Sequence, residues 1–99
     1  MTLDDFRASL AHRDPPDGLS PPLAGLWHDE RGDWNRAHRA VMEAEGPAAA
    51  WVHAYLHRKE GDLENARYWY RLARRPAADG PLETEWEQIA GSLLASEPR

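Results

Sequence analysis

The fold is decided by residues 46–76, GPAAAWVHAYLHRKEGDLENARYWYRLARRP. Gly46-Pro47 is typical of a helix start, because proline at the first helical position has no amide hydrogen to lose. Gly61-Asp62 indicates a glycine that ends one helix, followed by an aspartate that caps the next. Pro76 cannot continue that second helix. The stretch therefore predicts a helical hairpin with arms at about residues 47–60 and 63–75.

The same pattern occurs once earlier in the chain. Residues 28–37 align with residues 57–66 at an offset of 29, matching His, Gly, Asp and Ala in register. A single hairpin cannot bury its apolar face alone, so the two copies should stack and be covered by flanking helices. We expect the hairpins at about residues 21–46 and 47–76.

Two further helices are predicted outside the repeat. An acidic first turn after Thr2 and an apolar face indicate a helix over about residues 3–13. An apolar stripe predicts another over about residues 82–96, and the proline-rich segment 14–22 is expected to be an irregular connector. The predicted fold class is all-α, with two stacked antiparallel hairpins, flanking N- and C-terminal helices and about six helices in total.

Length and composition restrict the function. The 99 residues, 41% of them hydrophobic, fit a single helical domain over residues 1–99 that is too small to enclose a large cofactor as well as a core. A formal net charge of −5 disfavours binding to nucleic acid phosphates. The absence of cysteine excludes disulfides and thiolate metal ligands, so any metal would have to bind His, Asp or Glu.

The N-terminal residues favour a cytoplasmic location. They are acidic where a secretory signal would be basic, and no apolar run approaches the roughly 20 residues of a membrane span. We therefore expect a cytoplasmic protein with no membrane contact.

The segment 61–66, GDLENA, with Tyr70, Ala73 and Pro76 after it, resembles the second half of a tetratricopeptide-type repeat. In that family small residues let the paired helices approach closely, and the resemblance assigns this role to Gly25 and Ala54. Residues 51–76, with the block HAYLHRKEGD, also resemble a small bacterial family of such hairpins, from which no activity carries over. With these resemblances we expect a non-enzymatic protein-interaction module.

A basic surface is predicted on the helix over residues 63–75. Residues 58–75 contain six positive and three negative charges in an otherwise acidic chain. We expect Arg67, Tyr68 and Arg71 to contact a protein partner, with an acidic surface as the favoured chemistry. The open ends of a repeat stack also allow a homodimer. The alternative is that the glutamates of the last helix, Glu83, Glu85 and Glu87, neutralise these arginines in surface ion pairs.

Histidines suggest a second function, the binding of a metal or small ligand. His53 and His57 are four residues apart and share one helix face, and His28 occupies the same place in the first hairpin as His57 in the second. His38 is an accessory candidate. Zinc or a similar divalent metal uses this kind of spacing, although we expect no resident cofactor if the histidines only hydrogen-bond neighbouring groups. Both interpretations remain open at this point.

Enzymatic activity finds no support in the sequence. The His-Glu-x-x-His motif is absent, because Ala54, Tyr55 and Leu56 separate His53 from His57, and no serine has a plausible base partner. The abundant aromatic residues either line a ligand cleft or fill the core, and the core is favoured in a repeat packed largely with Ala and Leu. We expect only Tyr68 and Trp86 to keep part of a ring in solvent.

Overall fold

The computed structural model describes residues 1–96, which form six α helices and no strand. Their bounds are α1 Leu3–Ser9, α2 Pro21–Glu30, α3 Trp34–Met42, α4 Pro47–Glu60, α5 Leu63–Ala73 and α6 Leu82–Ser96. The predicted all-α fold class with about six helices is confirmed. None of the helices in this part of the chain is both long and apolar enough to cross a lipid bilayer.

The two glycine-aspartate junctions have the same geometry. Gly32 and Gly61 adopt positive φ values of 83° and 91°, which an L side chain would resist. The following aspartates, Asp33 and Asp62, each accept a hydrogen bond from a backbone amide three residues later, at 3.0 and 3.2 Å. The sequence repeat is thus a repeat of helix stop and helix start, and it folds the chain back at the same point twice.

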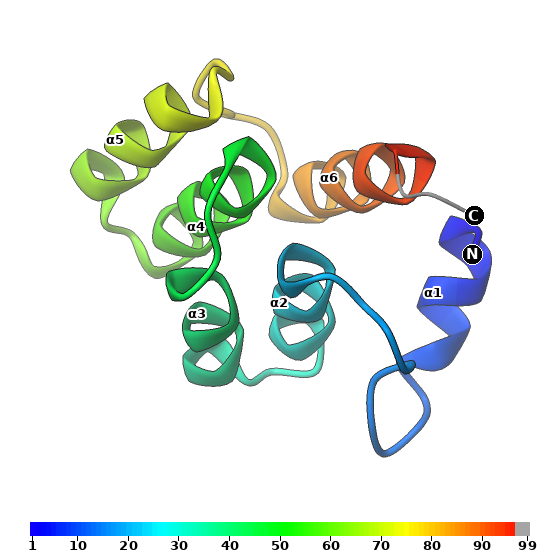
Figure 1. Cartoon of the computed structure of the whole chain (residues 1–99). Helices are drawn as coiled ribbons and strands as arrows, with labels where there is room; N and C mark the ends of the chain where they lie inside the picture. Colours follow the sequence, from blue (N-terminus) through cyan, green and yellow to red (C-terminus); the bar gives the residue numbers. More distant parts are fainter. Residues whose placement is uncertain (97–99) are drawn as a thin grey trace.

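The helices form two neighbouring hairpins with α6 and α1 beside them (Figure 1). Helix α2 packs on α3 and α4 packs on α5, giving two hairpins, and α4 also contacts both helices of the first hairpin. Helix α6 lies against α2 and α4, and α1 packs on α6. Both flanking helices therefore lie on the side of α2 and α4 that faces away from α3 and α5 (Figure 1).

Three helices end earlier than the sequence predicts. Helix α1 ends at Ser9 rather than near residue 13, because the next three amides bond to carbonyls only three residues back and Arg31 donates to the carbonyl oxygens of Leu10 and His12. Helix α3 stops at Met42, three residues short, where the amide of Ala44 likewise bonds to the carbonyl three residues back.

Helix α5 ends at Ala73 rather than at Arg75. Arg74 adopts a left-handed conformation with φ 59°, and the amide of Arg75 bonds back to the carbonyl of Tyr70. Pro76 accounts for this early stop, because the residue before a proline is disfavoured in the helical region.

Helix α4 is the centre of the core, and α2 approaches it closely at a glycine. All nine residues from Ala49 to His57 are buried. A Cβ atom added to Gly25 would lie 3.0 Å from Val41 Cγ1 and 3.3 Å from Val52 Cγ1, so α2 approaches both α3 and α4 at this glycine. The expected close approach at Gly25 is confirmed, and Ala54 is fully buried.

The aromatic residues mostly fill the core, as expected. Of the two that were predicted to be partly exposed, Tyr68 is exposed and Trp86 is not. Tyr68 is 48% exposed, which confirms that prediction. Trp86 is fully buried, so the prediction was wrong there. The reason is the packing of α1 on α6: Phe6 stacks on the Trp86 ring at 5.7 Å, and the indole nitrogen donates to the carbonyl oxygen of Leu26.

Replacing each of two helical glycines by alanine tests this packing. In G91A the new Cβ meets no atom within 4 Å, so the gain in helix propensity should raise the free energy of unfolding by about 0.5–1 kcal/mol. In G25A the same gain is opposed by overpacking of about 1–3 kcal/mol against Val41 and Val52, so the variant should be less stable than wild type. Urea denaturation measures both. Equal stabilisation by the two variants would show that α2 is not constrained at Gly25.

Candidate functional site

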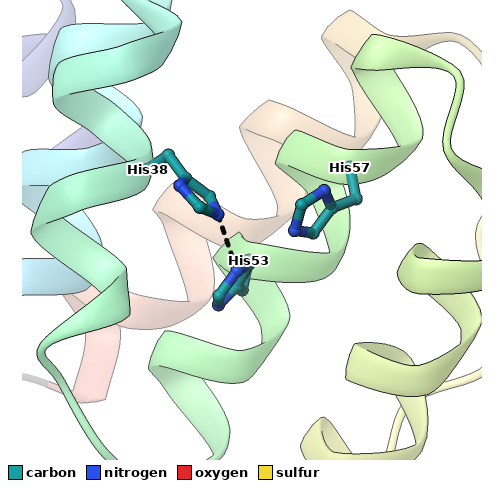
Figure 2. A group of neighbouring side chains, drawn as sticks. All are labelled: His38, His53 and His57. Carbon is teal, nitrogen blue, oxygen red and sulfur yellow. Dashed lines mark hydrogen bonds between the residues drawn. The ribbon is translucent and has the colours of Figure 1, made fainter.

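Three histidine side chains meet where the two hairpins touch (Figure 2). His38 comes from α3, and His53 and His57 come from successive turns of α4. One ring nitrogen of each lies within 4.8 Å of the others. His53 and His57 are 5% and 6% exposed and His38 is half-buried, so the group is largely shielded from solvent.

Aromatic contacts hold the rings in place. The indole nitrogen of Trp34 donates to the carbonyl oxygen of Leu56 at 2.9 Å, which fixes α3 against α4. The Trp34 ring stacks on His38 with centroids 4.8 Å apart. On the other side Trp69, from α5, stacks on His53 at 3.8 Å. The three imidazoles therefore lie between two tryptophans contributed by the neighbouring helices.

Hydrogen bonds orient the imidazoles further. Nε2 of His38 and Nε2 of His53 are 3.0 Å apart, so one of them carries the shared hydrogen. Nδ1 of His57 lies 2.6 Å from Oε1 of Glu60, and the side-chain nitrogen Nδ2 of Asn65 lies 3.4 Å from His57 Nε2. A carboxylate on Nδ1 leaves the Nε2 lone pair of His57 free to accept from Asn65 or to bind a metal.

Burial keeps His38 and His53 neutral. Desolvation, followed by the neighbouring His38 and His57, lowers the pKa of His53 to about 4. Burial is also the main cause that lowers the pKa of His38. At neutral pH both rings are therefore unprotonated imidazoles, the form that binds metals.

The structure brings together three of the four predicted histidines. His28 lies outside the group, on α2, where its ring meets the edge of Trp27 at 5.2 Å and burial lowers its pKa. The repeat gives His28 and His57 equivalent positions, but His57 packs against Trp34 and His38 of the preceding hairpin. Within residues 1–96 only α1 precedes α2, and His28 has no such neighbour there. His38, expected to be accessory, takes its place.

Sequence reasoning missed the residues that orient the cluster. Glu60 follows His57 by three residues on the same helix face, a spacing that was open to inspection. Asn65 and Trp69 reach the histidines because α5 folds back on α4; the hairpin was predicted, but not which side chains of α5 would meet the histidines. Asp62 groups with His57 and Glu60 and not with His38 and His53.

The geometry suits a metal ion as well as a hydrogen bond. Two nitrogens bound to one tetrahedral zinc at about 2.0–2.1 Å lie roughly 3.3 Å apart. The 3.0 Å separation of the His38 and His53 Nε2 atoms is close to this value. A zinc ion could therefore bind both Nε2 atoms after a movement of a few tenths of an ångström, while the His57 nitrogen, which lies within 4.8 Å of the others, would have to come closer to bind it as well.

The predicted partner-binding residues lie on a separate surface. Arg67, Tyr68 and Arg71 are exposed on α5. The expected ion pairs between glutamates of α6 and the basic residues of 58–75 form at one point only, because Glu85 pairs with Arg58 whereas Glu83 and Glu87 pair with Arg7. Within residues 1–96 no acidic side chain forms an ion pair with Arg67 or Arg71.

Comparisons with models of known protein families, with curated proteins and with solved structures find no match for this chain. Its function is therefore inferred from the geometry of the histidine cluster and of the α5 surface.

The lowered pKa of His53 predicts acid sensitivity of the metal-free protein. The unfolded chain takes up a proton near pH 6.5 and the folded protein only near pH 4, so stability is present above pH 6.5 and is lost as the pH falls toward 4. Between pH 7 and pH 5 the loss should be about 2 kcal/mol.

Urea denaturation in a chelator at a series of pH values measures this loss. H53Q should flatten the dependence, whereas H12Q, which removes an exposed histidine elsewhere, should keep it. The same slope in H53Q as in wild type would show that the proton uptake on unfolding belongs to other groups.

Proposed function

We propose that this protein binds a divalent transition metal, with zinc as the favoured ion, through His38, His53 and His57. The observation that carries the proposal is the convergence of three imidazole nitrogens within 4.8 Å of one another, from two helices that belong to different hairpins. Three neutral nitrogen ligands favour zinc, copper, nickel or cobalt over magnesium and calcium, which prefer oxygen.

The surroundings of the cluster support this proposal. Glu60 accepts from Nδ1 of His57, which is the usual outer partner of a metal-bound histidine and makes Nε2 more basic. Trp34 and Trp69 restrict rotation of the His38 and His53 rings. Ligands held in this way lose little conformational freedom when the metal binds.

Metal binding would connect the two hairpins. His38 belongs to α3 and the other two ligands belong to α4, so an ion shared among them stabilises the contact between α3 and α4. Because the unfolded chain has no such site, the binding free energy adds to the stability of the fold. The proposed role is a metal-dependent tie between the repeats.

Zinc should raise the melting temperature of wild type. At 100 times the dissociation constant a single site adds about 2.7 kcal/mol, or roughly 10–20 °C for a domain of this size. H53Q and H38Q should lose the shift, and H28Q should keep it, because His28 lies outside the cluster. Calorimetric titration should give one zinc per chain. An unchanged melt in wild type, or an equal loss in H28Q, would contradict the site.

A second candidate function is a non-enzymatic interaction module that binds an acidic protein surface. The observation in its favour is that Arg67 and Arg71 have no acidic partner among the described side chains, although the chain as a whole carries a net charge of −5. Tyr68 and Leu72, 48% and 49% exposed, provide apolar contact area beside them. The resemblance to tetratricopeptide repeats also favours this function.

Charge reversal tests the second candidate. A fluorescent glutamate-rich peptide with one central tyrosine should bind wild type, and R67E/R71E should weaken binding at least tenfold at low salt. The matched control, R13E/R39E, makes the same change in net charge at two other exposed arginines and should have little effect. Equal losses in the two variants, or tighter binding of a single-stranded RNA of the same length, would contradict an acidic protein partner.

A further inference from the structure

The histidine cluster supplies three ligands and no fourth. Within residues 1–96 no carboxylate joins His38, His53 and His57 in one group. The Glu60 carboxylate is already hydrogen-bonded to Nδ1 of His57. Asp62 accepts a hydrogen bond from the backbone amide of Asn65 as the cap of α5. Zinc and cobalt in nitrogen sites prefer four ligands, and a site with three protein ligands keeps an exchangeable position.

Charge determines what would occupy that position. Three neutral imidazoles leave the full charge of a divalent ion in a place where two of the ligands are 5% and 6% exposed. Burying uncompensated charge is costly, and an anionic ligand reduces that cost. Two carboxylates lie near His57, but Glu60 bonds to the far side of its ring and Asp62 caps α5. A fourth ligand with negative charge is therefore favoured over a neutral one.

An open groove reaches one member of the cluster, His53. It has a volume of about 480 Å³ and runs between the connection from α3 to α4 and the surface of α5. His53 and Trp69 form part of its wall, together with apolar side chains that include Val41, Ala50 and Leu72. A small solute can therefore approach His53 without unfolding of either hairpin.

We infer that a metal bound by His38, His53 and His57 keeps a fourth coordination position that takes a small monovalent anion entering through this groove. The inference rests on the proposed metal site. The donor is a single anionic atom, which either hydroxide derived from the bound water or an added anion such as azide can supply. In the second case azide displaces the water molecule, and the metal keeps its oxidation state.

Cobalt(II) gives a test with a visible signal. The metal-free full chain is loaded with one equivalent of Co²⁺, and its visible absorption bands report the ligands of the metal. Titration with azide should change these bands in a saturable manner with one azide per cobalt. Perchlorate at the same ionic strength should leave them unchanged. In the absence of azide the bands should shift with pH as the bound water loses a proton.

Two tryptophan variants test the route. L72W places a bulky ring at the exposed edge of the groove and should slow azide binding at least fivefold while retaining Co²⁺ binding. L63W makes the same change at another exposed leucine of α5, outside the groove, and should match wild type. Equal azide rates in L72W and L63W would overturn the route.

The outcomes separate the two proposals. If no cobalt binds, the metal site itself is wrong. If cobalt binds with the bands of a nitrogen-rich site but azide and pH leave them unchanged, the metal site stands and the exchangeable fourth position is refuted.

Discussion

The structure depends on the burial of α4 on every side. Residues Ala49 to Leu56 are all buried, and α2, α3, α5 and α6 each contact this helix. A helix buried all round is normally apolar. This one carries His53 and then His57 at its last buried position, and a buried polar group without a partner is costly. The helices that surround α4 must therefore supply hydrogen-bonding groups as well as apolar area.

Each neighbour does so at a different point. Helix α2 brings Asp29, 2% exposed, to Lys59 at 3.1 Å. Helix α6 brings Glu85, 3% exposed, to Arg58 at 2.8 Å, where it also accepts from the hydroxyl of Tyr70. Removing one partner of such a pair costs far more than the pair contributes, so these contacts fix the placement of α2 and α6.

The contact between α3 and α4 differs from the other two because only neutral groups meet there. His38 and His53 share one hydrogen, and the only carboxylate that acts on either ring, Glu60 on His38, is outweighed by burial. Desolvation consequently lowers the pKa of both histidines. An added cation other than a proton can strengthen this contact, since a metal binds both lone pairs at once.

Local features of the sequence predicted local features of the fold. The bounds of α4 and α6 and both glycine-aspartate junctions follow from residues within one turn of each helix end. The exchange of His28 for His38 was not predictable in this way. The repeat correctly gave His28 and His57 equivalent positions. The side chains around His57, however, come from the preceding hairpin, and within residues 1–96 no such hairpin packs against His28. Trp86 was misjudged for the same reason, because its cover is Phe6, far away in sequence.

The same desolvation explains why the cluster would bind a metal well at neutral pH. A metal competes with protons for imidazole nitrogens, and a pKa of about 4 at His53 removes that competition above pH 5. Because His38 and His53 are neutral already, binding requires only that the shared hydrogen move from an Nε2 to an Nδ1 atom, with no net loss of a proton. These two ligands should therefore add almost no pH dependence to metal affinity from pH 6 to 8, and any dependence in that range would come from the proton released by the fourth ligand. A histidine cluster exposed to solvent would instead lose affinity as the pH fell through 6.5.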